Sequence, residues 1–83
     1  MKLKALFEYI KFRLRGYSAP DTESFAFVKP GMLVFDIGAN RGNYTKVFLS
    51  KGARVIAVEP QEACVDFLKL RYTFSKNDPK FYT

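Results

Sequence analysis

The sequence has no histidine, no tryptophan and a single cysteine, Cys64. One cysteine excludes an internal disulfide and any metal site built from several cysteines. The absence of histidine removes the most common general base and metal ligand. Apolar runs fall far short of the roughly 18 residues that span a membrane, and charges interrupt every apolar stretch of residues 1–16, unlike a signal peptide. We therefore expect a cytoplasmic protein without a metal centre.

The composition is that of a folded protein rather than a disordered one. Hydrophobic residues make up 48% of the 83 residues and aromatic residues 17%, which argues against disorder. The chain is shorter than the usual domain of about 100–150 residues. Its net charge of +6 is concentrated near the N-terminus, and a localised basic segment favours nucleic acid or an anionic membrane as a partner, or is simply a solvated helix face.

Residues 1–16 have the pattern of an amphipathic basic helix that ends at Gly16. Its apolar residues recur at the spacing of one helix face. A membrane-surface helix is one interpretation. We favour the other, in which the apolar stripe packs on the core of the domain, because the stripe is narrow and the helix is short. The stripe consists of Leu3, Leu6, Phe7, Ile10 and Leu14.

Residues 17–31 are expected to be a linker that ends in the strong turn signal Lys29-Pro30-Gly31. Within it, residues 25–28 form a short apolar run that is either a helical turn or an edge segment. The remaining residues, 32–83, alternate between strand and helix patterns.

Two apolar runs, 32–37, which is broken only by Asp36, and 54–58, are typical of parallel strands covered on both faces. A helical pattern between them, closed by Lys51-Gly52, makes a strand–helix–strand unit. A second helical pattern follows to about residue 73, and Lys80–Thr83 is expected to begin a third strand. The predicted fold class is therefore α/β: a Rossmann-like parallel sheet of two to three strands with flanking helices, preceded by the N-terminal helix.

The turn after the first strand carries the pattern Asp36-x-Gly38-x-Asn40-x-Gly42. A dinucleotide fingerprint starting at Gly38 requires glycine at positions 40 and 43, where the chain has asparagine, so a nicotinamide-dependent oxidoreductase is disfavoured. Gly38 allows close approach of a ligand to the backbone, and Asn40 tolerates a left-handed conformation. The first amides of the next helix favour a carboxylate, while Asp36 can accept hydrogen bonds from an ammonium.

Glu59 ends the second strand, about twenty residues beyond this loop. An acid at that place accepts hydrogen bonds from ribose hydroxyls. The two strand ends together suit a ligand with an amino-acid end and a nucleoside end, and S-adenosylmethionine has both.

Residues 34–45 together with Val58-Glu59-Pro60 resemble the start of an FkbM-type S-adenosylmethionine-dependent methyltransferase. The resemblance implies that Asp36, Gly38, Asn40 and Gly42 line the methionine end of the cofactor and that Glu59 binds the ribose. It also implies methyl transfer, to oxygen of a sugar, glycan or small metabolite. It covers about residues 32–62, so we expect the chain to be the N-terminal part of such an enzyme and inactive alone.

The sequence assigns no catalytic residue and no methyl acceptor. Arg41 is expected to be solvated, and Cys64 to be a buried, inert thiol. The alternative function is a small basic module that uses residues 1–16 to bind a membrane or nucleic acid without enzymatic activity. Nucleic acid is the less favoured of these two partners.

Overall fold

The computed structural model describes residues 3–16, 20–73 and 79–82. Helix α1 (Leu3–Arg15) is followed by a 3₁₀ turn, η1 (Glu23–Phe25), and by the strands β1 (Leu33–Ile37), β2 (Arg54–Val58) and β3 (Lys80–Tyr82). Helices α2 (Asn43–Ser50) and α3 (Glu62–Arg71) connect the strands. The chain is thus a small α/β protein, and the predicted third strand is confirmed. The sequence between α3 and β3 also predicts a polar turn at Ser75–Pro79, and most of that segment lies outside the described residues.

The three strands form one parallel sheet in the order β1-β2-β3. Leu33 pairs with Arg54 at one end of β1 and Ile37 with Val58 at the other. The strands are parallel, so the carboxyl ends of β1 and β2 lie next to each other at one edge of the sheet. The two strand ends that the sequence singled out therefore meet.

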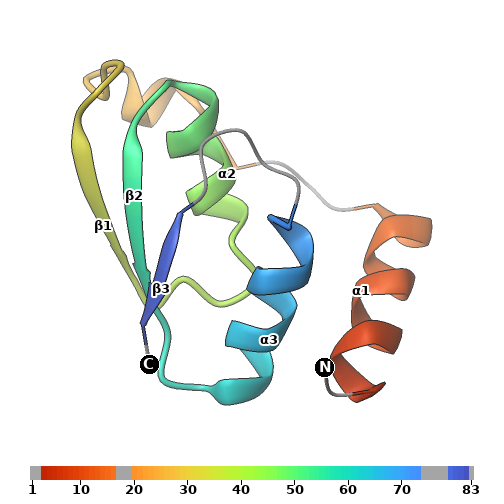
Figure 1. Ribbon diagram of the computed structural model, residues 1–83. Coiled ribbons are helices and arrows are strands. Elements are labelled where there is room, and N and C mark those ends of the chain that lie inside the picture. The colour runs from red at the N-terminus through yellow and green to blue at the C-terminus, as the bar shows by residue number, and fades with distance from the viewer. Residues whose placement is uncertain (1–2, 17–19, 74–78, 83) are drawn as a thin grey trace.

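The molecule has three layers: the sheet, then α2 and α3, then α1 on the outer side of α3 (Figure 1). The core lies between the sheet and the middle helices, where Phe48 packs near Val55 and Leu68 packs near Ala57. In the expected linker, η1 and the turn after it bring Val28 into this core. Among the described residues, no helix has the length and apolarity to cross a bilayer.

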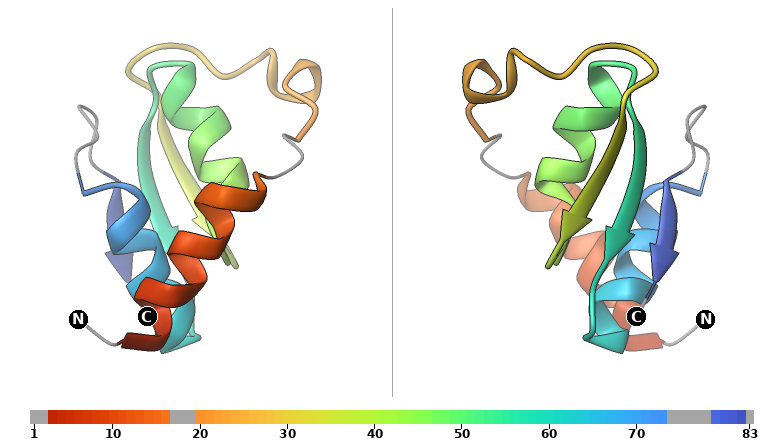
Figure 2. Two further views of the ribbon diagram at one scale, coloured as in Figure 1. Left: turned by 90° about the vertical axis from the view of Figure 1, so that its right-hand side faces the viewer. Right: turned by 90° about the vertical axis from the view of Figure 1, so that its left-hand side faces the viewer.

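The expectation that both faces of the strands are covered is wrong. Within the described residues, all the helices lie on one side of the sheet, and no described element covers the opposite face (Figure 2). Leu33, Phe35 and Ile37 of β1 point to this open face and are exposed. An apolar strand can pack against other elements on both faces, but its sequence does not show whether such elements are present.

The preferred packing of α1 is also wrong. Its apolar stripe is not the face that meets the domain: Leu3, Phe7, Ile10 and Leu14 are exposed, and Leu6 is half-buried. The buried residues of α1 are Ala5 and Phe12. Phe12 and Tyr9 both pack edge-on against Phe67 of α3, with ring centroids 5.2 and 5.8 Å away. Aromatic pairing, which helical periodicity does not encode, thus selects the buried face. Gly16, at φ 73°, ends the helix as expected.

Candidate functional site at the carboxyl edge of the sheet

The loop between β1 and α2 takes three left-handed residues in quick succession. Gly38, Asn40 and Gly42 have φ angles of 75°, 51° and 83°. The amides of Gly38 and Ala39 both donate to the carbonyl of Val58, at 2.7 and 3.2 Å. These bonds hold the loop against the end of β2 and give it the shape that its glycine and asparagine spacing predicts.

Glu59 joins the two strand ends directly. Its side chain is only 4% exposed, and its carboxylate accepts two backbone amides, those of Asn40 and Gln61, each at 2.9 Å. The first bond reaches back across the sheet edge to the loop, and the second fixes the entry into α3. A ribose at Glu59 would have to use the remaining lone pairs of the carboxylate or displace one of these amides.

Asp36 lies near the end of β1 and turns toward α2. It accepts a hydrogen bond from the Thr45 hydroxyl at 2.5 Å. Burial raises the pKa of the Asp36 carboxyl, while hydrogen bonds from the Thr45 side chain and backbone act in the opposite direction. An acid at the first turn of a helix also complements the helix dipole. Asp36 therefore fastens the strand to α2 and places a carboxylate beside the amino end of that helix.

Thr45 is a residue whose role sequence reasoning missed. It is completely buried, and its hydroxyl is satisfied by Asp36. The available signal was its position in the first turn of α2, where a short hydroxyl side chain can reach the preceding strand end. The buried Thr45 therefore makes a polar contact with Asp36 and does not only contribute to the buried side of the helix.

The two glycines that flank Asn40 have different surroundings. A Cβ on Gly38 would meet no atom within 4 Å, so the space above it is open. A Cβ on Gly42 would lie 2.5 Å from Leu68 Cδ2 and 3.0 Å from Tyr72 Cε2. The Tyr72 hydroxyl also donates to the Gly42 carbonyl at 2.6 Å. Gly38 thus leaves room for a ligand, whereas the space at Gly42 is filled by α3.

Arg71, which the sequence gave no reason to select, holds the loop from the side of α3. Its Nη1 donates to the Arg41 carbonyl at 2.8 Å and to the Asn43 side-chain oxygen at 2.6 Å. Its guanidinium carbon also lies 4.6 Å from the centre of the Phe12 ring. One cation therefore connects the loop, α3 and α1, and such a three-way contact leaves no pattern in the sequence.

Arg41 is exposed, as expected of a solvated residue, and it also donates to Glu8 of α1 at 3.1 Å and lies over the Phe67 ring. The expectation for Cys64 needs correction, because this residue is half-buried rather than buried. Its thiol lies 3.7 Å from the Asn40 side-chain oxygen, and burial, followed by the charge of Glu59, raises the Cys64 pKa. The protonated, unreactive form of this thiol is thereby favoured.

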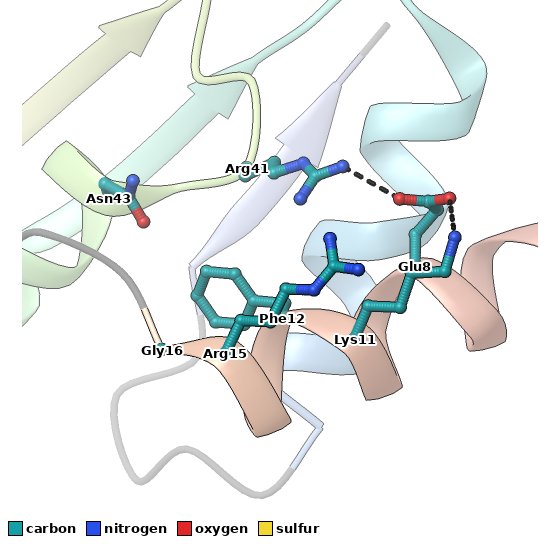
Figure 3. A pocket seen from close by; sticks show the side chains of 7 residues that line it. All are labelled: Glu8, Lys11, Phe12, Arg15, Gly16, Arg41 and Asn43. Carbon is teal, nitrogen blue, oxygen red and sulfur yellow. Dashed lines mark hydrogen bonds and ion pairs between the residues drawn. The ribbon is translucent and has the colours of Figure 1, made fainter.

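A cavity of about 310 Å³ lies between α1 and the start of α2. Figure 3 shows Lys11 and Arg15 on one wall, with Arg41 above them. None of the five residues predicted to bind the cofactor lines it. It is lined by Glu8, Lys11, Phe12, Arg15, Gly16, Arg41 and Asn43.

The chemistry available at the sheet edge is that of binding and orientation. Four of the five predicted residues lie together at the open side of the loop, namely Asp36, Gly38, Asn40 and Glu59. The fifth, Gly42, packs against α3 and shapes the turn. The described residues contain no group of three or more His, Cys, Asp or Glu side chains that could hold a metal ion. Neither a protein-family model nor a curated protein matches this chain.

Proposed function

We propose that this chain is the S-adenosylmethionine-binding part of a methyltransferase, built on a Rossmann-like half-sheet. The three strands lie in sequence order with helices between them, as one mononucleotide-binding half of a doubly wound sheet requires. Open α/β sheets bind ligands outside the carboxyl ends of their strands. The loop at Gly38–Gly42 and the acid Glu59 occupy that place.

The observation that carries the proposal is the 2.9 Å hydrogen bond from the Asn40 amide to Glu59. It joins the two short motifs of the sequence, which are nineteen residues apart, into one site. Each motif alone has a simple explanation as turn chemistry. Because the two motifs meet at one edge of a parallel sheet, they form one site in which the acids Asp36 and Glu59 lie near the open backbone of Gly38.

The proposed roles follow from these positions. Asp36 and the first amides of α2 would face the amino-acid end of the cofactor, since a carboxylate suits an ammonium and helix amides suit a carboxylate. Gly38 supplies the open backbone surface. Glu59 would reach the ribose while it anchors the loop, and Gly42 shapes the turn.

The cofactor would supply an electrophilic methyl group, and the complete enzyme would transfer it to oxygen of a sugar, glycan or small metabolite. Such a transfer needs the acceptor held in near-attack geometry. The described residues offer binding groups for the cofactor, and we assign none of them as a catalytic base. A cytoplasmic setting is part of the proposal, since the sequence contains no pair of cysteines for a disulfide within the chain.

The test is calorimetric titration of the chain with S-adenosylmethionine, comparing Gly38→Ala with Gly31→Ala. Both glycines have positive φ (75° and 82°), and an added Cβ meets nothing within 4 Å at either one. The two substitutions therefore carry the same backbone strain, but only Gly38 lies in the proposed site. We expect Gly38→Ala to weaken binding by about tenfold or more, because its methyl group takes the space of close ligand approach.

Gly31→Ala should bind as the wild type does. Equal affinity of the two variants would show that the cofactor does not approach Gly38. Absence of binding to the folded wild-type chain would contradict the proposal itself.

A further inference from the structure

The apolar stripe of α1 is presented to solvent. Leu3, Phe7, Ile10 and Leu14 are 65%, 55%, 43% and 83% exposed. With about 100° between successive residues of a helix, these four side chains fall within an arc of about 60°. They form a continuous strip, here called the outer stripe of α1, along a helix of thirteen residues.

The opposite face of α1 is held firmly by the domain. Phe12 and Ala5 are buried, and Phe12 contacts both the Phe67 ring and the Arg71 guanidinium of α3. Glu8 adds an ion pair to Arg41 at 3.1 Å. The outer stripe therefore lies on the side of α1 that faces away from α3, on a helix whose orientation these contacts fix. In the left view of Figure 2, α1 is the element nearest the viewer.

Cations border the outer stripe on both sides. At about 100° per residue, Lys4, Lys11 and Arg15 follow one border and Arg13 the other. All four are exposed. Lys11 and Arg15 also line the cavity of Figure 3, where Arg41 adds a third cation from the loop. The one acid of α1, Glu8, faces the domain and is engaged by Lys11 and Arg41.

We propose that α1 docks the protein on a membrane surface rich in anionic phospholipid, with the helix lying parallel to the bilayer. An apolar strip with basic borders is the composition of helices that rest at the headgroup boundary. The strip enters the acyl region while the cations meet the phosphates. This inference rests on α1 and does not depend on the proposed cofactor.

The charge pattern distinguishes this occupant from two others. A second copy of the chain, packed stripe against stripe, would bring the cationic borders of two helices together, and like charges at close range repel. A nucleic acid would find an apolar strip where its phosphates require cations. An anionic bilayer satisfies both the strip and its borders.

The test is co-sedimentation of the full chain with vesicles of phosphatidylcholine alone and of phosphatidylcholine with about 30% phosphatidylserine, at two salt concentrations. We expect binding to the anionic vesicles only, and weaker binding at higher salt. Leu14→Glu should reduce binding by about tenfold or more, since burial of one leucine side chain is lost. Phe27→Glu is its matched control, because Phe27 is 65% exposed on a different part of the surface.

A second pair of variants tests the borders. Arg13→Glu should weaken binding by more than the roughly fivefold expected for loss of a single cation, because it also adds an anion. Lys46→Glu, an exposed lysine on α2, should have no comparable effect. Far-UV circular dichroism verifies that all four variants are folded.

Three outcomes would overturn the proposal: equal binding to neutral and anionic vesicles, no loss of binding in Leu14→Glu, or an equal loss in Phe27→Glu. A dimer in lipid-free solution that Leu14→Glu dissolves would likewise overturn it, in favour of a second copy on the outer stripe. Sedimentation velocity supplies that measurement.

Discussion

Replacement of Gly42 by alanine tests whether the loop is seated against α3 as the structure shows. The added Cβ would lie 2.5 Å from Leu68 Cδ2 and 3.0 Å from Tyr72 Cε2. Leu68 is fully buried and cannot move aside into solvent. Overpacking of this kind costs about 1–3 kcal/mol, and a non-glycine residue in the left-handed region costs about 1–2 kcal/mol more.

Gly38→Ala is the control that separates these two costs. Gly38 has nearly the same φ, 75° against 83°, but an added Cβ meets nothing within 4 Å. It should lose only the backbone cost of about 1–2 kcal/mol, whereas Gly42→Ala should lose about 2–5 kcal/mol in all. A chain of this size has about 4–12 kcal/mol of stability in total, so the difference is easily measured.

Urea denaturation followed by far-UV circular dichroism is the assay. With a slope near 1 kcal/mol per molar urea, the two midpoints should differ by about 1–3 M. Leu68→Ala should cost less stability in the Gly42→Ala background than in the wild type, because it removes the closest atom, and this coupling would appear in a double-mutant cycle. Equal midpoints for the two glycine variants, with no coupling to Leu68, would refute the packing.

Further substitutions probe the two acids of the site. Glu59→Ala should lower the free energy of unfolding by about 2–4 kcal/mol, because two backbone amides lose a charged acceptor, and Glu59→Gln should lose less because its amide oxygen can still accept one of them. Glu23→Ala, at an exposed glutamate, should lose almost no stability. A loss as large as that of Glu59→Ala would contradict the stabilising role of the hydrogen bonds from the Asn40 and Gln61 amides to Glu59. Asp36→Asn should change how stability depends on pH. Burial raises the pKa of Asp36 in the folded chain above its ordinary value of 3.8. The contribution of Asp36 to stability is therefore complete below pH 3.8 and falls as the pH rises through the raised pKa. Asparagine does not ionise, so urea midpoints of the variant should gain on the wild type between pH 3 and 7, and a constant difference would show that Asp36 is not desolvated.

The strand–loop–helix unit could be predicted from sequence because its signals are local. Gly38 and Asn40 are needed for left-handed turns, and Gly52 for the end of α2, at φ 81°. The apolar runs predict β1 and β2 as strands regardless of which elements pack against them. The register of β1 on β2 then brings Glu59 to the loop, so the meeting of the two motifs followed from the parallel topology alone.

The parts that could not be predicted depend on contacts between distant elements. The choice of buried face on α1 is made by Phe67 and Arg71, which lie more than fifty residues away along the chain. Periodicity identifies an apolar stripe on a helix but does not say what the stripe contacts. Likewise, Thr45 and Arg71 complete the loop through pairings with Asp36 and Asn43 that become visible only when the elements are assembled.

The central claim is that S-adenosylmethionine binds at the carboxyl edge of the sheet, above Gly38. The most direct measurement is a ¹H–¹⁵N correlation spectrum of the chain recorded during titration with this cofactor. We predict that the amides of Gly38 and Asn40 shift with saturation, while those of Gly31 and Gly52, at the opposite end of the strands, stay in place. No shift at Gly38 and Asn40 at millimolar cofactor, or shifts confined to the cavity beside α1, would contradict the claim.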